Sequence, residues 1–195
     1  MQFKFITALL LITGLTTAYS SFAQQGSVMI YGSLNYQDHN KTGQTFGANP
    51  IGVGYFFNGH AVTGINYAFS REKDALHDLA ERHHEAGLFY SDSKMLGEHF
   101  VLIGQLDAHY VWGSTDLNTP ASYDYKGYLF RLYPLIGVIL GHGWALKAKF
   151  CELSYRQTKG NDAAQTKDKL FIAGINGSTI GLGVSKNISF NKHRS

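Results

Sequence analysis

Two residues on one predicted strand have the types and spacing of a catalytic pair. Asp107 and His109 are two positions apart, so their side chains share a face of a β-strand. A carboxylate that orients an imidazole, together with a serine, is the arrangement that many hydrolases use for nucleophilic catalysis. By the phase of the strand His109 faces inward, so we predict no catalytic residue and no enzyme.

Three histidines and two glutamates lie close together in and beside the polar segment 71–81. They are His77, Glu81, His83, His84 and Glu85. Imidazole and carboxylate groups are common ligands of transition metals. No compact ligand motif is present, so we prefer a solvated charged loop and predict no metal site and no cofactor. Metal binding by His77, His83 and His84 stays open as the alternative.

Charged residues also occur on the polar faces of predicted strands. They are Glu85, Asp107, Arg131, Lys147 and Lys149. A buried charge without a partner is costly, so we expect the cations to pair with Asp107 or Glu85 across the interior. Such a row could line a gated ion path. We prefer a salt-bridged plug, because a ring of eight strands is only wide enough for side chains to fill.

The strand signal is clearest between Thr179 and Phe190. Apolar residues alternate there with glycine, serine and asparagine, with Lys186 as the exception. A period of two indicates a strand with one apolar and one polar face. The polar face consists of very small side chains, whereas a face in bulk water is usually charged. This pattern favours a cramped, hydrated interior and an apolar face turned towards lipid.

The same alternation predicts eight strands. They cover residues 27–36, 46–57, 60–70, 84–91, 99–112, 127–140, 144–157 and 170–190. A change of phase at Cys151 and Glu152 predicts a bulge. Pro50 and Pro134 predict further bulges or unpaired positions, since proline lacks the backbone donor. The pair 176–177, Asn-Gly, is either a hairpin that makes nine strands or a kink that keeps eight, and we prefer the kink.

Short and long connections alternate along the chain. Asn58 and Gly59 predict a two-residue hairpin, and residues 92–97 and 141–143 are short connections as well. The longer polar segments cover residues 37–45, 71–81, 113–126 and 158–169, with one helical turn predicted after Asp74 from Leu76 and Leu79. Short turns at one end and long loops at the other are typical of an outer-membrane barrel.

The first residues and the composition bear on location. A positive Lys4, an apolar stretch over 5–15 and small residues at Ser21 and Ala23 predict a signal peptide at 1–23 and one domain at 24–195. Without Lys4 the chain has 16 (17 − 1) basic and 14 acidic residues, a balance that excludes the basic footprint of a nucleic-acid-binding protein. Cys151 is the only cysteine, so no intrachain disulfide is expected.

Aromatic residues are frequent, with 13 Phe, 12 Tyr and 2 Trp. Phe100 begins one predicted strand, and Tyr110 and Trp112 end it. Twelve steps of ~3.3 Å, tilted by roughly 40°, span about 30 Å, which matches an apolar band between two aromatic girdles. A soluble sandwich is the alternative, but its outer face should carry more charge. We therefore predict an all-β fold, an eight-stranded antiparallel up-and-down transmembrane β-barrel.

Two related hairpin segments carry a family resemblance. The segment from Pro50 to Ala61, its relative from Pro134 to Ala145, and the final strand ending at the aromatic Phe190 resemble the OmpA-like outer-membrane β-barrel domain proteins, of the small single-domain type in Bacteroidota. The resemblance covers essentially the whole of 24–195, through diffuse motifs. It implies a barrel that the barrel-assembly machinery inserts into the outer membrane, in contact with the lipopolysaccharide leaflet.

These features together predict an integral outer-membrane protein of a Gram-negative cell. We expect a monomer with a structural or surface-interaction role, an interior filled by side chains and no nucleic-acid partner. Two alternatives stay open. One is a lipid-modifying enzyme of the lipid A deacylase kind, and the other is a narrow pore.

Overall fold

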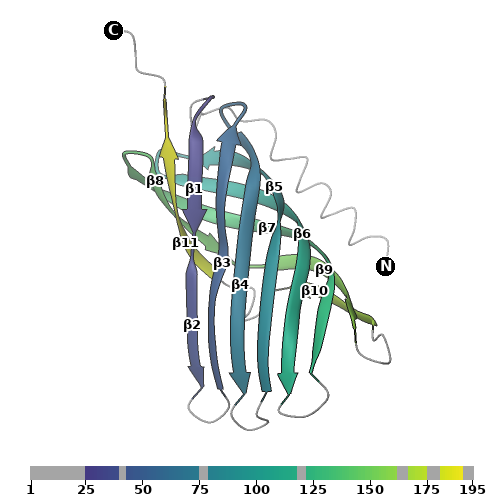
Figure 1. Ribbon diagram of the computed structural model, residues 1–195. Helices are drawn as coiled ribbons and strands as arrows, with labels where there is room; N and C mark the ends of the chain where they lie inside the picture. Colours follow the sequence, from purple (N-terminus) through teal and green to yellow (C-terminus); the bar gives the residue numbers. More distant parts are fainter. Residues whose placement is uncertain are drawn as a thin grey trace.

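The computed structural model describes residues 25–39, 43–74, 79–117, 122–161, 167–174 and 181–190, which form an antiparallel β-sheet (Figure 1). The strands are β1 (Val28–Gly32), β2 (Leu34–His39), β3 (Gly43–Phe56), β4 (Ala61–Asp74), β5 (Leu79–Leu96), β6 (Phe100–Leu117), β7 (Tyr123–Gly141), β8 (Trp144–Lys149), β9 (Glu152–Gly160), β10 (Lys167–Gly174) and β11 (Gly181–Ile188). The described residues contain no helix long and apolar enough to cross a bilayer. The predicted signal peptide, residues 1–23, lies outside the described residues.

Eight of these strands close into a ring. β3 to β7 pair in sequence order, β8 pairs with both β7 and β11, and β1 pairs with both β11 and β3. Figure 1 shows β1 and β11 side by side where the first and last strands meet. Three predicted strands are interrupted and give β1 and β2, β8 and β9, and β10 and β11. The prediction of an all-β antiparallel fold built on eight strands is therefore confirmed.

Strand directions show how the chain runs from β10 to β11. β10 is antiparallel to β9 and β11 is antiparallel to β8, while β8 and β9 are both antiparallel to β7. β10 and β11 therefore run in the same direction, as expected for one interrupted strand, whereas a hairpin would reverse the direction. Asn176 and Gly177 themselves lie outside the described residues.

The predicted irregularities lie where strand pairing changes. The register between β3 and β4 shifts at Pro50. Pro134 lies at the point where the pairing of β7 changes from β9 to β8, and Cys151 lies in the break between these two partners. A proline is tolerated at such positions because no ladder hydrogen bond needs its missing donor. The bulge predicted at Cys151 and both proline predictions are confirmed.

At one end of the ring the strands extend further than predicted. β4 continues to Asp74, β5 begins at Leu79, β6 continues to Leu117 and β7 begins at Tyr123. Much of the predicted polar loops is therefore strand. The helical turn predicted to include Leu79 is wrong at this residue, because Leu79 pairs with Asp74 on one side and with Leu117 on the other.

At the opposite end the turn at Asn58 and Gly59 is longer than the predicted two-residue hairpin. β3 ends at Phe56 and β4 begins at Ala61. The Asn58 side-chain oxygen accepts the backbone N–H groups of His60 and Ala61, over 2.9 Å and 2.6 Å. These bonds replace the backbone bond of a tight hairpin and close a wider turn. The turn between β7 and β8 has two residues and is tight, as predicted.

The two faces of the strands differ as the alternation predicts. Leu88, Leu106 and Leu182 are 64%, 48% and 75% exposed, whereas Asp107 and Ser185 are 0% and 1% exposed. Apolar clusters fill part of the interior. One consists of Met29, Phe56, Val62 and Phe89 with Tyr31, and the other consists of Val101, Ile103, Tyr133 and Leu135 with Met95. The aliphatic face of the strands therefore turns outward, and the interior also holds the charged groups.

Candidate functional site

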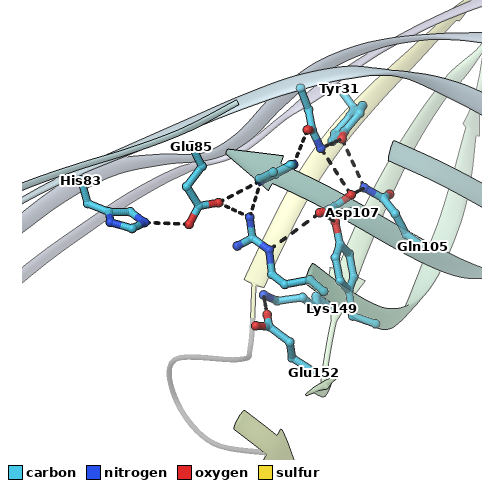
Figure 2. Close-up of polar contacts among 11 residues, drawn as sticks. Tyr31, His83, Glu85, Gln105, Asp107, Lys149 and Glu152 are labelled. Atoms are coloured by element: carbon cyan, nitrogen blue, oxygen red, sulfur yellow. Dashed lines mark hydrogen bonds and ion pairs between the residues drawn. The ribbon is translucent and has the colours of Figure 1, made fainter. Parts of the chain in front are cut away.

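A network of polar side chains occupies the interior of the ring (Figure 2). Arg131 of β7 contacts Glu85 of β5 through Nη2, and its Nε lies 3.9 Å from Oδ2 of Asp107 on β6. Both carboxylates are buried. A cation shared between two buried carboxylates offsets the cost of removing them from water. The predicted pairing of Arg131 with Asp107 and Glu85 is confirmed.

His109 and Asn66 extend this network across the interior. His109 Nε2 donates to Asn66 Oδ1 over 2.5 Å, and Nδ1 accepts from Arg131 Nη2 over 3.0 Å. Nδ1 also lies 3.1 Å from Glu85 Oε2. Both ring nitrogens of this buried imidazole are therefore engaged by neighbouring side chains. His109 thus has the surroundings of a structural histidine.

Asp107 has several hydrogen-bond donors around it. Its Oδ1 accepts from Gln105 Nε2 over 2.9 Å and lies 3.4 Å from Asn66 Nδ2, while Oδ2 accepts from the Tyr133 hydroxyl over 2.9 Å. Gln105 and Asn66 also donate to the Tyr31 hydroxyl, over 3.2 Å and 2.8 Å. Because the hydrogen-bonding capacity of the carboxylate is met from three strands, β4, β6 and β7, the network fixes these strands relative to one another.

A chain of contacts leads from Glu85 towards the start of β5. His83 Nε2 donates to Glu85 Oε1 over 2.8 Å, and His83 Nδ1 lies 2.8 Å from the Tyr125 hydroxyl. That hydroxyl donates to Glu81 Oε1 over 2.9 Å. Glu81, His83 and Glu85 share one face of β5 because they are two residues apart. Hydrogen-bonded side chains therefore fill the interior along several residues of strand.

The two interior lysines have different partners. Lys149 Nζ pairs with Glu152 Oε2 over 2.8 Å, across the break between β8 and β9. Lys147 Nζ lies 3.2 Å from the Met29 sulfur and 5.6 Å from the centre of the Tyr31 ring. A thioether and an aromatic face are much weaker partners for an ammonium group than a carboxylate.

The expected pairing of the lysines with a carboxylate is confirmed for Lys149 and wrong for Lys147. The partner of Lys149 is Glu152, because Arg131 occupies Asp107 and Glu85. Lys147 is only 8% exposed, and no carboxylate among the described residues forms an ion pair with it. A buried ammonium group without a counter-charge is unfavourable. Lys147 is therefore the one interior cation of the described chain that its neighbours leave unbalanced.

Of the histidines predicted to lie together in or beside a loop, His83 and His84 belong to strand β5, and the alternation of the strand separates them. His83 faces the interior. His84 faces outward, where its Nδ1 lies 2.7 Å from the Tyr67 hydroxyl and its ring stacks on Trp112. His77 lies outside the described residues. Within the described ranges, no group of three or more His, Cys, Asp and Glu side chains could hold a metal ion.

Aromatic side chains gather in two places on the outer face. One row, across β4, β6 and β7, consists of Tyr67, Tyr110, Trp112 and Tyr128, whose ring centroids lie 5.8 to 6.3 Å apart along the row. Towards the other end of the strands Phe57 stacks on Tyr90, with centroids 6.3 Å apart. Aliphatic residues such as Ile65 and Leu88 lie exposed between these two places.

No model of a protein family matches this chain, and no curated protein shows significant similarity to it. Function is therefore inferred from the geometry alone. Tyr31, Tyr125 and Tyr133 are network members that sequence reasoning missed. The phase of their strands places Tyr31 beside Met29, and Tyr133 beside Arg131, on the inward face. Their aromatic character made them resemble outer-face residues.

Proposed function

We propose that the protein is an integral outer-membrane β-barrel with a structural or surface-interaction role. The observation that carries the proposal is the sidedness of the ring. Exposed apolar side chains on β4, β5, β6, β7 and β11 include Ile65, Leu88, Leu106, Phe130 and Leu182. Soluble monomers rarely expose contiguous apolar patches larger than a few hundred Å². In a bilayer an apolar outer face around a polar interior is the expected arrangement of a barrel.

The outer aromatic rows and the strand lengths support the same proposal. Tyr and Trp side chains on both sides of an aliphatic band fit the two interfaces of a membrane. β5, β6 and β7 have 18, 18 and 19 residues, whereas about 9–11 residues cross a bilayer. Exposed Arg71 and Arg82 lie on the outer face beyond the row at Trp112, and exposed Lys126 lies opposite Trp112. In the proposed orientation, the ends of β4 to β7 that lie beyond this row project from the cell as a polar surface.

The interior network supports a structural role without a cofactor. Most of its donors and acceptors bond to one another, with Arg131 Nε as an exception, and an eight-stranded barrel leaves room for little besides side chains. A closed ring also pairs the backbone groups that a bilayer would otherwise leave without partners. The proposed partners are membrane lipids, including the lipopolysaccharide leaflet, and the barrel-assembly machinery during insertion of the monomer.

A matched pair of arginine substitutions tests the proposal. In lipid vesicles we expect Leu106→Arg, within the aliphatic band, to lower the free energy of unfolding by about 2–4 kcal/mol. Ser114→Arg, beyond Trp112 on the same face, should cost about 0–1 kcal/mol. Heat-dependent gel migration checks the fold, and outer-membrane fractionation checks the location. Negligible effects of both substitutions, or recovery of the protein in a soluble fraction without detergent, would contradict the proposal.

A further inference from the structure

The seam between the first and last strands has an opening. The pairing of β1 with β11 ends at Gly32, opposite Val184. The preceding residues of β11, 181–183, pair with β8 on one edge and have no strand partner on the other edge among the described residues. β2 continues from β1 but pairs only with β3 within the described chain. Among the described residues, the strand pairing across this seam therefore ends at Gly32.

A cavity of about 60 Å³ lies at this opening. Arg131, Lys147 and Lys149 line the cavity from the interior. Leu182 and Val184, which are exposed on the outer face, line it from the other side. The cavity therefore connects the charged interior with the outer surface through the seam.

The inner side of this cavity is cationic. Lys147 is buried, and its contacts are a thioether and an aromatic ring. Arg131 Nε is buried and has no hydrogen-bond partner. The nearby carboxylates of Glu85 and Asp107 already lie against Arg131. A buried ammonium group without an anionic acceptor is costly, so the cavity presents Lys147 to an anionic group.

The outer side of the opening is lined mainly by apolar side chains, and Lys186 is the one charged residue in the lining. A surface groove of about 770 Å³ includes Ile30, Ile51, Trp144 and Leu146 in its lining. The groove and the cavity share Leu182 and Val184, so one leads into the other. An apolar groove that ends at a buried cation is complementary to an acyl chain with a single anionic group at its end.

We propose that the seam binds a long-chain fatty acid, with the carboxylate at Lys147 and the acyl chain in the outer groove. A carboxylate carries the single negative charge that the one unbalanced ammonium group of Lys147 requires. This inference goes beyond the structural role proposed above. It depends on that role only in placing the acyl chain on the lipid-facing surface.

Trp144, in the wall of the groove, provides a reporter for binding. The chain has two tryptophans, so Trp112→Phe leaves Trp144 as the only fluorescent indole. Addition of dibromostearate to this detergent-folded protein should quench Trp144 saturably, because bromine quenches a nearby indole. Lys147→Met should weaken the apparent affinity at least about tenfold, because a charge-assisted hydrogen bond is lost. The methyl ester of dibromostearate should give no saturable quenching.

Three controls separate binding from partitioning into detergent. Trp144→Phe keeps only Trp112, so its quenching measures the contribution of dibromostearate that is dissolved in the detergent. Lys126→Met changes an exposed lysine of β7 and should bind dibromostearate like the parent. Heat-dependent gel migration shows that each variant is folded. Unchanged affinity of Lys147→Met, or equal quenching by the methyl ester, overturns the proposal. Displacement by equimolar lysophosphatidate overturns the choice of a carboxylate. The arginine substitutions above test the membrane location separately.

Discussion

Arg131 is the residue on which the interior depends most. It contacts Glu85, lies 3.9 Å from Asp107 and donates to His109. Asp107 and His109 lie on the neighbouring strand β6, Glu85 lies on β5 beyond it, and the contacts of Asp107 extend the network to β4. Removing the cation would leave two buried carboxylates without a counter-charge, whereas removing an exposed cation leaves no such group.

We therefore expect Arg131→Met to lower the free energy of unfolding by about 3–5 kcal/mol. Arg82→Met, at an exposed arginine of β5, should change it by less than about 0.5 kcal/mol. The measurement is denaturant-induced unfolding of the protein folded in detergent or vesicles. A loss below about 1 kcal/mol for Arg131→Met would show that the network does not hold the interior together.

The sequence placed Glu85, Asp107, His109 and Arg131 inside because the period of two is a local property of each strand. It did not assign the partner of Lys147, because partners depend on distances across the ring and not on the phase of one strand. Arg131 pairs with both carboxylates, and Lys149 pairs with Glu152 across the bulge at Cys151. The partner of each interior charge is therefore known only from the three-dimensional structure.

At the scale of the strands, close backbone approach limits the side chains that the sheet accepts. Gly87 of β5 pairs with His109 of β6. A Cβ at Gly87 would collide with the Ala108 carbonyl oxygen and with the ring and backbone of His109. Gly104, also on β6, has nothing within 4 Å of its Cβ position. The two glycines therefore differ in surroundings while both lie within strands.

Gly87→Ala should cost about 1–3 kcal/mol, because the strands must shift and the His109 contacts must adjust. Gly104→Ala serves as the matched control and should stay within about 0.5 kcal/mol of the parent. Thermal or denaturant unfolding of both variants measures the difference. Equal stabilities of the two variants would contradict the close approach of β5 and β6.

The sequence predicted the middles of the strands and not their ends. In the middle, aliphatic outer residues alternate with small or polar inner ones, and this contrast reveals the strand. Near Arg71 and Arg82 the outer face becomes charged, so the alternation disappears, although backbone pairing continues to Asp74 and from Leu79. Hydrogen bonding between neighbouring strands does not depend on hydropathy, so these strand ends carry no signal in the sequence.

At the scale of the whole molecule, the ring of strands has an apolar outer face and a polar interior. A closed antiparallel ring with buried Asp107 and exposed Leu88 has the inverse of the polarity of a soluble domain. The proposed outer-membrane location follows from this polarity, since lipid is the solvent in which an aliphatic outer face is stable.

Spin-label accessibility at two outer-face positions of β5 tests this central claim most directly. Leu88→Cys and Arg82→Cys, each in a Cys151→Ser background and reconstituted in bilayers, carry labels six residues apart, about 20 Å along the strand. We predict that molecular oxygen, which concentrates in lipid, reaches the label at position 88, whereas a water-soluble nickel chelate reaches the label at position 82. A nickel chelate that reaches both labels equally would contradict the claim that this face contacts lipid.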